Sequence, residues 1–578
     1  MVTLKINGIS VTVPEEYTIL QAAKEIDIEI PSLCYLKDIN CIGSCRVCEV
    51  EIVERGRSRL VAACVYPVAE GMEVYTNTPS VRASRRTNIE LILSTHHKKC
   101  LSCVRGNNCE LQKLAFDYGV DEDRFAQEEI IYQIDDKSPY IVRDNNKCIL
   151  CRRCTAMCNK IQTVGAIDEI GRGYKVHINC VFEKSLNDVS CVGCGQCIVA
   201  CPVGALNEKS NIEDVWEAIA DPKKKVVFFT APSIRATLGE CFDMPIGTNV
   251  EGKMIAGIKR IGADSVFNMD VTADLTIVEE AHELLERIKN QEVMPMFTSC
   301  CPGWVKFVEH HYPDFIPNLS TCKSPQQMFG ALLKTYYAQK KGIDPKDLFV
   351  VSVIPCTAKK FECTRPEQNA FDFRDVDVAL TTRELAKMIK GAGIKFTELK
   401  DEAFDDPFEN ATGAGAIFGA TGGVMEAALR TAADILDGDS TKIEFKEVRG
   451  TQGIKEATYT LGGKKLNVAV ASGLGNARKI LDSIKNGEKE YHFVEIMACP
   501  GGCINGGGQP VQGDSVRNYI DLKTLRSKAL YDKDKKLKQR KSHLNPVIKT
   551  LYDEYLDAPG KHRAHRLLHT TYVKRNKF

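Results

Sequence analysis

The sequence predicts a multidomain protein that combines α+β and α/β folds. Its 578 residues exceed what one compact core usually holds, so three or four domains are expected. Cysteines cluster at short spacings in the first 208 residues, whereas apolar strands alternate with helical segments from about residue 209. The first pattern indicates small domains built around metal, and the second indicates an α/β domain with a largely parallel core sheet.

The composition excludes several classes of function. A hydrophobic content of 44%, with 26% charged residues, is ordinary for a globular protein, and a net charge of +1 gives no reason to expect nucleic acid or an anionic membrane. The first residues, MVTLKINGIS, lack the features of a signal peptide, and no apolar run is long enough to span a bilayer. A cytoplasmic protein is therefore expected, in which 25 cysteines indicate metal rather than disulfides.

Residues 1–80 predict a small β-grasp domain with a 2Fe-2S cluster. The segment TLKINGISVTV is a hairpin around Asn7-Gly8, and TILQAAKEI is a helix. The thiols form the frame C-x10-C-x2-C-x15-C, contributed by Cys34, Cys45, Cys48 and Cys64. This frame is a relaxed plant-type ferredoxin arrangement, and CIGSCRVCEVEI resembles the 2Fe-2S segment of the large cluster-bearing subunit of respiratory complex I. Zinc is the alternative occupant, and Cys41 is expected to be a buried small hydrophobe.

Residues 81–125 predict a small domain with a 4Fe-4S cluster. Cys100, Cys103 and Cys109 supply three thiolates within ten residues, one short of a closed site. His96 completes the frame H-x3-C-x2-C-x5-C, which resembles the one-His, three-Cys cluster of the same complex I subunit. His97 is a rival ligand by proximity alone, and a lone histidine is more often structural.

Residues 126–208 predict a ferredoxin-like domain with two 4Fe-4S clusters. The run C-x2-C-x2-C-x3-C occurs twice, and in such pairs the fourth cysteine crosses to the other cluster. One expected ligand set is Cys148, Cys151, Cys154 and Cys201; the other is Cys158, Cys191, Cys194 and Cys197. Zinc is again the alternative, and Cys180 is expected to bind nothing.

Residues 209–578 predict the α/β domain. The runs KKVVFF, DSVFNMD, PMFTS, LFVVSVIP and YHFVEIMA read as buried strands, and sites in such sheets form at the carboxyl ends of strands. Three of the loops that follow, TSCCPGW, PCTAKKFE and ACPGGCINGGGQP, contain a possible thiolate quartet, Cys301, Cys356, Cys499 and Cys503. Glycines in the last loop suit a bulky ligand, and Pro302 opens a helix whose positive end favours a thiolate at Cys301.

These three segments resemble the signature segments of the iron-only (FeFe) hydrogenases. With the accessory cysteine groups in the same order, the chain is similar over essentially its full length to the monomeric clostridial ferredoxin-linked type. The resemblance implies an H-cluster, in which a 4Fe-4S cubane on the cysteine quartet is bridged through Cys503 to a two-iron unit with CO, cyanide and dithiolate. It also implies pocket contacts from Ala231, Pro232, Ser233, Ser324, Gln326, Lys359, Phe418 and Met497. Ile354 departs from the family, which usually has methionine there.

One helix face is expected to matter for protons. In TADLTIVEEAHELLERI, Glu280, Glu283 and Arg287 lie at i, i+3 and i+7, a pattern that also suits a solvated, salt-bridged surface stripe. The resemblance instead implies a proton relay in which these residues act with Ser320 and Cys300. A thiol between a carboxylate and a metal centre can accept and release a proton with little movement.

The segment 515–578 is basic and helix-prone, and it resembles the small subunit that is a separate chain in some hydrogenases. A structural role is expected first and partner docking second. Cys241, Cys322 and Cys363 match no ligand position and are expected in the core.

The expected function is reversible reduction of protons to H₂ with electrons from ferredoxin, relayed by one 2Fe-2S and three accessory 4Fe-4S clusters to the H-cluster. The expected protein is a monomer whose partners are ferredoxin, H₂, protons and maturation proteins, with no nucleic acid and no membrane. Three alternatives are a hydrogen sensor, an iron–sulfur assembly factor and a subunit of a nicotinamide-linked complex. The stretches GAGAIFGATGG and SGLGNAR both miss the dinucleotide motif G-x-G-x-x-G.

Overall fold

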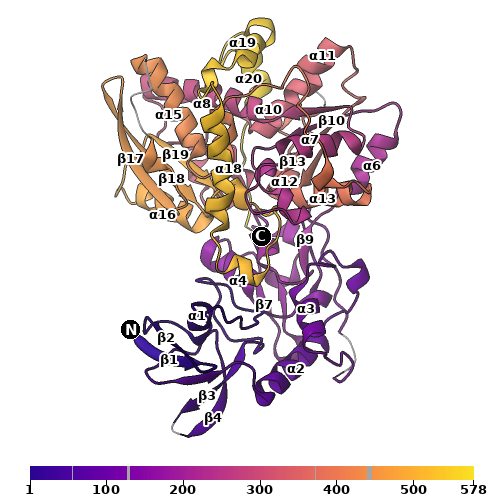
Figure 1. Ribbon diagram of the computed structural model, residues 1–578. Coiled ribbons are helices and arrows are strands. Elements are labelled where there is room, and N and C mark those ends of the chain that lie inside the picture. Colours follow the sequence, from indigo (N-terminus) through magenta and orange to yellow (C-terminus); the bar gives the residue numbers. More distant parts are fainter. Residues whose placement is uncertain (55, 126–129, 371–372, 439–444, 578) are drawn as a thin grey trace.

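The computed structural model describes residues 1–54, 56–125, 130–370, 373–438 and 445–577. The domain boundary expected at residue 126 falls outside these ranges. The cysteine-rich domains occupy one end of the molecule and the α/β domain the other (Figure 1). No helix in the described ranges is long and apolar enough to cross a lipid bilayer.

The N-terminal domain is a five-stranded mixed sheet with one helix, in the order β2-β1-β5-β3-β4. The predicted hairpin is confirmed, because Asn7 and Gly8 both take positive φ angles between two antiparallel strands. The predicted helix is also confirmed, with Thr18 and Gln21 forming a capping box at its start. The elements are β1 Val2–Ile6, β2 Ile9–Val13, α1 Ile19–Lys24, β3 Glu49–Glu54, β4 Arg57–Ala62 and β5 Glu73–Tyr75.

The next two cysteine groups lie among short elements. Helices α2 and α3 pack against each other, and α4 runs directly into a π-helical turn, Met157–Ile161. Two small antiparallel pairs, β6 with β9 and β7 with β8, hold the ferredoxin-like part together. The bounds are α2 Pro79–Leu93, α3 Glu110–Asp117, β6 Ile141–Arg143, α4 Arg153–Ala156, β7 Asp168–Ile170, β8 His177–Asn179, α5 Gln196–Ala200 and β9 Leu206–Glu208.

The α/β domain contains two four-stranded sheets, so the prediction of one core sheet is wrong. The first sheet, β11-β10-β13-β16, is entirely parallel, whereas the second, β12-β19-β18-β17, is parallel except for its edge strand β17. Apolar runs identify buried strands without specifying their neighbours, because pairing is decided by distant contacts. The strands are β10 Lys225–Thr230, β11 Ser265–Asn268, β12 Met296–Phe297, β13 Leu348–Ile354, β16 Val378–Thr381, β17 Ile454–Leu461, β18 Lys464–Ser472 and β19 Phe493–Met497.

A long helix, α8 (Asp270–Asn290), packs against helices of both halves of this domain. Its neighbours include α10, α14 and α15, and apolar side chains from both ends of α8 belong to two different hydrophobic cores. The remaining main helices are α6 Ile212–Ala220, α7 Glu251–Arg260, α9 Pro302–His311, α10 Pro325–Leu332, α11 Ala338–Lys341, α12 Ala358–Glu362, α13 Thr382–Gly391, α14 Gly413–Ala416, α15 Gly423–Asp437 and α16 Leu474–Lys485.

The C-terminal segment, yellow in Figure 1, lies along the α/β domain. Its longest helix, α18, contacts α14 and the two turns Ile417–Gly419 and Cys503–Asn505. The segment therefore covers loops that carry predicted site residues. Its helices are α17 Asp514–Arg517, α18 Leu522–Lys536, α19 Pro546–Leu551 and α20 His562–Leu568.

Candidate active site

One cavity lies where the carboxyl ends of the two sheets meet. It is lined by loops that follow β10 and β13 of the first sheet, and β12 and β19 of the second. The structure brings the predicted quartet together on this cavity, from three loops as expected: Cys301, Cys356, Cys499 and Cys503.

The four thiols share a buried setting. Burial raises the pKa of each, and their proximity adds repulsion between the thiolate forms. Cys301 caps the start of α9, ahead of Pro302, and its sulfur accepts a hydrogen bond from the Ala498 amide at 3.4 Å. Buried thiols facing one another in this way suit a positively charged metal group, which would hold them deprotonated.

Glycines let the loops converge around the cavity. A Cβ at Gly506 would lie 2.2 Å from the Pro355 carbonyl oxygen, and one at Gly502, where φ is +96°, would lie 2.7 Å from the Thr421 nitrogen. The Ser233 hydroxyl is buried at the cavity without a hydrogen-bond partner in the described chain. The four thiols and this free donor fit an iron–sulfur group with polar ligands.

Most of the predicted pocket residues line the same cavity, and one does not. Those on the cavity wall are Ala231, Pro232, Ser233, Gln326, Ile354, Lys359, Phe418 and Met497. Ser324 lies behind the wall, where its hydroxyl donates to Glu362 at 2.9 Å. Cys300 also lines the cavity, next to the Cys301 ligand position.

Sequence reasoning missed Glu362, which organises the Lys359 side of the cavity. Its carboxylate lies 2.9 Å from the Lys359 Nζ and also accepts hydrogen bonds from Ser324 and Gln326. Burial alone would lower the pKa of Lys359, but the Glu362 charge holds it above its usual value. The available signal was the i, i+3 spacing of the two residues in PCTAKKFE.

Of the predicted relay residues, Cys300 lines the cavity, whereas Glu280, Glu283 and Arg287 lie on α8. Glu280, on α8, is 1% exposed, and neither of its oxygens has a hydrogen bond of standard geometry. Burial and then the neighbouring Glu283 charge raise the pKa of Glu280 to about 8. Burial and then the Glu280 charge raise the pKa of the Cys300 thiol, so the two groups are close enough to interact electrostatically.

The outer relay residues are joined by hydrogen bonds. The Ser320 hydroxyl donates to Glu283 at 2.8 Å, and Arg287 donates to the other oxygen of Glu283 at 2.6 Å. Arg287 is 7% exposed and also donates to the Leu319 carbonyl at 2.9 Å. The alternative of a solvated surface stripe is therefore wrong, because this face of α8 packs against the loop that contains Ser320.

The two ferredoxin-type cysteine groups lie on two separate cavities. The structure divides the eight thiols as the crossover predicts: Cys148, Cys151, Cys154 and Cys201 on one cavity, and Cys158, Cys191, Cys194 and Cys197 on the other. Cys194 also lines the active-site cavity. The second group is thus adjacent to the predicted quartet.

Close backbone contacts hold this second group against the active-site loops. The Thr357 hydroxyl donates to the Gly193 carbonyl at 2.6 Å. A Cβ on Gly195, where φ is +68°, would lie 2.9 Å from the Gly507 Cα. A larger residue at Gly195 would push the two parts of the protein apart.

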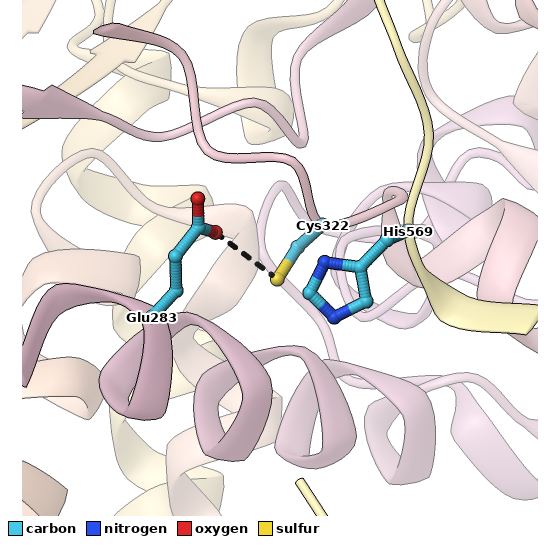
Figure 2. Close-up of side chains that lie close together, drawn as sticks. All are labelled: Glu283, Cys322 and His569. Atoms are coloured by element: carbon cyan, nitrogen blue, oxygen red, sulfur yellow. Dashed lines mark hydrogen bonds between the residues drawn. The ribbon is translucent and has the colours of Figure 1, made fainter. Parts of the chain in front are cut away.

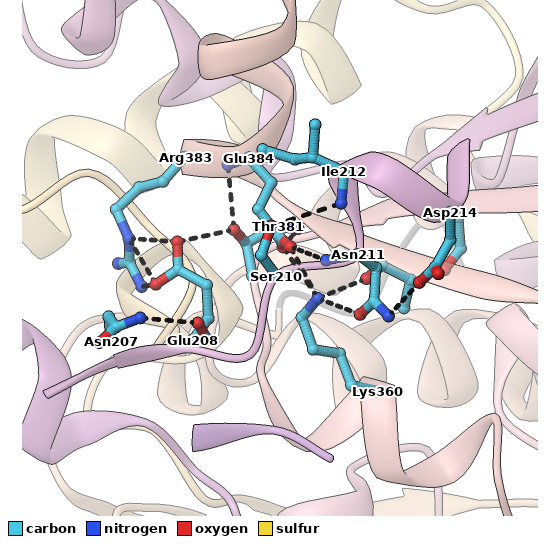
Figure 3. A network of polar contacts seen from close by, with 12 residues as sticks. Asn207, Glu208, Ser210, Asn211, Ile212, Asp214, Lys360, Thr381, Arg383 and Glu384 are labelled. Carbon is cyan, nitrogen blue, oxygen red and sulfur yellow. Dashed lines mark hydrogen bonds and ion pairs between the residues drawn. The ribbon is translucent and has the colours of Figure 1, made fainter. Parts of the chain in front are cut away.

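A polar network fixes the same junction (Figure 3). Arg383 on α13 forms an ion pair with Glu208 on β9 and donates to the Gly507 carbonyl at 2.9 Å. Burial opposes the charge on Glu208, but Arg383 lowers the pKa of this carboxyl to about 2. Beside it, Lys360 donates to Asn211 at 2.7 Å and to Glu384 at 3.0 Å.

The first two cysteine groups are brought together to different extents. The Cys34 thiol contacts those of Cys45 and Cys64, and Cys48 also contacts Cys64. Cys41 is exposed, so its expected burial is wrong, since it lies outside this thiol cluster at the surface.

The His96 group is less complete. Cys103 and Cys109 lie near each other, and His96 is buried with a free ring nitrogen, Nδ1. Burial lowers the pKa of His96 to about 4, which keeps the ring neutral as a ligand requires. Within the described ranges, no hydrogen bond joins the His96 ring to the three thiols.

The cysteines without a ligand prediction lie mostly inside. Cys322 and Cys363 are buried as expected, whereas Cys241 is only partly buried. Cys180 is buried beside Arg143.

Comparisons with known proteins agree with this organisation. Residues 224–507 match the family described as "Iron only hydrogenase large subunit, C-terminal domain", and residues 520–575 match "Iron hydrogenase small subunit". Residues 1–79 match a 2Fe-2S iron-sulfur cluster binding domain. Residues 85–124 match the "NADH-ubiquinone oxidoreductase-G iron-sulfur binding region", and residues 138–207 match the "NADH-quinone oxidoreductase subunit 3, ferredoxin-like domain".

Two full-length relatives and a solved structure are similar to the chain. The NADP-reducing hydrogenase subunit HndD of Solidesulfovibrio fructosivorans is 48% identical, and all of both chains is covered. Iron hydrogenase 1 of Clostridium pasteurianum is 44% identical over 99% of this chain and 100% of its own. The FeFe-hydrogenase HydA1 of Chlamydomonas reinhardtii covers 64% of this chain and 100% of its own, at 40% identity and a TM-score of 0.58.

The cysteine quartet between two sheets, the accessory cysteine domains and these full-length similarities lead to one conclusion. The chain belongs to the iron-only (FeFe) hydrogenase family and is a hydrogenase oxidoreductase with iron–sulfur cluster domains.

Proposed function

We propose that the chain catalyses the reversible reduction of protons to H₂ with electrons from reduced ferredoxin. The observation that carries the proposal is the cavity between the two sheets. Four buried thiols meet there, and the cavity is also lined by Cys300, whose pKa responds to Glu280, and by Cys194 of the accessory group. A site with separate approaches for protons and electrons is what this reaction requires.

Cys301, Cys356, Cys499 and Cys503 would hold the cubane of the H-cluster, and Cys503 would be shared with the two-iron unit. When bound, this group supplies the centre at which electrons and protons combine. The protein positions it with one cation and one free hydroxyl, because Lys359 is held charged by Glu362 and Ser233 has no other partner. The residues proposed to line the pocket are Ala231, Pro232, Ser233, Gln326, Ile354, Lys359, Phe418 and Met497, with Ser324 behind the wall against Glu362.

The proton route runs along α8. Arg287 orients the Glu283 carboxylate, the Ser320 hydroxyl donates to Glu283, and these residues would pass the proton to the buried Glu280. With its pKa raised to about 8, Glu280 holds a proton at neutral pH and can donate it. Cys300, which lines the cavity and interacts electrostatically with Glu280, would deliver the proton.

The electron route runs through the four accessory groups. A 2Fe-2S cluster would occupy Cys34, Cys45, Cys48 and Cys64, and a 4Fe-4S cluster would occupy His96, Cys100, Cys103 and Cys109. Two further 4Fe-4S clusters would occupy the crossover sets, and the set with Cys194 adjoins the quartet. Ferredoxin is the proposed donor, and maturation proteins would supply the two-iron unit.

A cytoplasmic monomer is the proposed form of the protein. All 25 cysteines are unpaired, which suits a compartment that keeps thiols reduced. The segment similar to the small subunit is fused to the same chain, so no separate subunit is needed to cover the site.

Infrared absorption of the matured protein tests the central proposal. Bands at metal–CO and metal–cyanide frequencies are expected, and their disappearance in Cys503→Ala would link them to the quartet. Iron-loaded protein without such bands would refute the assignment of an H-cluster.

The second candidate function is that of the hydrogen-activating subunit in a nicotinamide-linked complex. The 48% identical relative named for NADP reduction favours it. In this chain, GAGAIFGATGG contributes Phe418 and Gly419 to the active-site cavity, so a dinucleotide would bind on a partner subunit. Co-purification of a nicotinamide-reducing subunit with the native chain would favour this role over the monomer.

The two remaining alternatives have less support. A hydrogen sensor without catalytic turnover would not need the relay thiol Cys300. An assembly factor would not need Lys359, which lines the cavity, or the Glu280–Arg287 face of α8.

A further inference from the structure

A thiol, an imidazole and a carboxylate meet outside the active-site cavity. They belong to Glu283 on α8, to Cys322 in the loop just before α10, and to His569 in the C-terminal segment (Figure 2). One ligand atom from each lies within 4.8 Å of the other two. We propose that Glu283, Cys322 and His569 form a binding site for a zinc-class divalent cation.

The donor set is the one that zinc prefers. Sulfur, nitrogen and carboxylate oxygen bind zinc at about 2.0–2.3 Å, which puts the donors of a tetrahedral site about 3.3–3.8 Å apart. The Cys322 Sγ already lies 3.7 Å from the Glu283 Oε2. The sulfur and the carboxylate oxygen therefore already have the separation that zinc requires. A small shift of the His569 ring towards them would bring the third donor to the same distance.

The imidazole has a partner that prepares it for a metal. The Glu279 carboxylate, which accepts from the Tyr552 hydroxyl and the Gly560 amide, lies 3.1 Å from His569 Nε2. A proton on Nε2 leaves a lone pair on Nδ1, where the Thr321 hydroxyl now donates at 2.7 Å. Metal-binding histidines commonly give their second N–H to a carboxylate in this way. The cation would displace the Thr321 hydroxyl.

Glu283 and a deprotonated Cys322 bring two negative charges to a divalent cation, and the Arg287 guanidinium paired with Glu283 offsets one of them. Glu283 contributes one negative charge and is oriented by Arg287. Cys322 contributes the second when its S–H bond breaks, a sulfur–metal bond forms and one proton leaves to solvent. The site is enclosed, since the Cys322 residue is fully buried and the His569 side chain is 6% exposed, while the Glu283 side chain is 13% exposed.

Occupation of the site would affect turnover. This consequence rests on the proposed function, in which Glu283 passes protons to Ser320 and Glu280. A cation bound to Glu283 would stop that transfer, so zinc is expected to inhibit the enzyme reversibly. The binding site itself does not depend on the relay.

Zinc K-edge X-ray absorption tests the site on cluster-loaded, chelator-washed protein given one equivalent of zinc chloride. One sulfur at about 2.3 Å, with nitrogen and oxygen at about 2.0–2.1 Å, is expected. Cys322→Ala should lose the sulfur signal and bind zinc at least ~10-fold more weakly. Cys241→Ala, which removes a thiol outside every proposed site, is the matched control and should match wild type.

His569→Gln keeps the thiol and provides a second test should Cys322→Ala fold poorly. It should retain the sulfur signal, lose the imidazole signal and weaken zinc binding. A wild-type spectrum without sulfur, or one unchanged in both variants, would overturn the site.

Hydrogen turnover with and without zinc separates the site from the relay. Wild type should be inhibited and recover with chelator, whereas Cys322→Ala should keep nearly all of its activity in zinc. Bound zinc seen by absorption without inhibition would support the site and refute the role of Glu283 in proton transfer.

Discussion

Cys300 and Cys301 are neighbours in sequence but differ in environment. Cys301 caps the start of α9 and its sulfur accepts a hydrogen bond from the Ala498 amide, whereas the Cys300 thiol is exposed to the charge of Glu280. A metal ligand must stay deprotonated, and a proton carrier must change its protonation state. The two thiols therefore suit two different roles at one cavity.

Replacing each of the two cysteines by alanine removes its thiol and should give different defects. Cys300→Ala should assemble all clusters but lose most H₂ turnover, by about 10²-fold or more, because general acid–base transfer is removed. Cys301→Ala should instead lose the cubane, measured as missing iron and altered electron paramagnetic resonance. Near-normal turnover of Cys300→Ala would exclude it from the relay.

The raised pKa of Glu280 has a consequence for stability. Below its unfolded-state value near 4.5, Glu280 is protonated in both states; between about 4.5 and 8 only the folded state keeps the proton. The folded state binds more protons in that window, so stability is lost as pH rises through it, by on the order of a few kcal/mol. Glu280→Gln should remove this part of the decline.

The thermal midpoint measured across that pH window checks the prediction. Wild type should lose stability towards pH 8 more steeply than Glu280→Gln, and the variant should also lose most turnover. Glu286→Gln, on the exposed side of the same helix, is the matched control and should follow the wild-type curve. Parallel curves for wild type and Glu280→Gln would contradict the buried protonated carboxyl.

Metal ligands could be predicted from the sequence, whereas the residues that hold the pocket side chains in place could not. The spacing of the clustered cysteines identifies them as ligands. Cys356 and Cys499 are identified because each follows an apolar run that predicts a strand. Glu362 could not be predicted in the same way, because a carboxylate near a lysine is common on helices. Its importance depends on Ser324 and Gln326, which reach it from α10 and its cap.

At the scale of elements, the strands were predictable but the sheets were not. Five of the strands follow from apolar runs, yet β10 and β13 pair in one sheet while β12 and β19 pair in another. The strand β16 and the pair β17–β18 were not predicted, although all three contain apolar residues. The cavity was still predictable at strand ends, because both sheets direct their carboxyl ends towards it.

Helix α13 and strand β9 are linked through Arg383 and Glu208, and this link should support electron transfer. Arg383→Leu leaves the Glu208 carboxylate buried and unpaired, at a cost of about 3–5 kcal/mol. Ferredoxin-linked turnover should fall, while deuterium–proton exchange, which needs no external electrons, should remain. Arg563→Leu, at an exposed position on α20, is the control.

Unchanged ferredoxin-linked turnover in Arg383→Leu would show that the junction does not depend on this ion pair. Acid should weaken the same link in wild type. Because the pKa of Glu208 is lowered, its contribution is present above the unfolded value and is lost as pH falls towards about 2.

At the scale of the whole molecule, the crossover of the ferredoxin-type ligands defines two unequal sites. The set with Cys158 adjoins the active-site cavity through Cys194. The set with Cys201 lines a separate cavity that shares no residue with the active site. Cys158→Ala and Cys201→Ala should each lose one different cluster, measured by iron content and electron paramagnetic resonance. The same cluster lost in both variants would contradict the crossover.

The C-terminal segment sets the order in which the molecule can be completed. Arg526 donates to the Ile504 carbonyl at 3.1 Å, and Leu530 packs with Ala236, Ala420 and Ile504, which adjoin the active-site loops. Arg526 and Leu530 leave the ribosome after all four cysteines of the quartet, since Cys301 and Cys356 are made far earlier and Cys499 and Cys503 shortly before. The wall of the hydrogen-activating chamber therefore closes only after all four of these cysteines have been synthesised. Until then the chamber stays open, and insertion of a preassembled inorganic centre can follow translation.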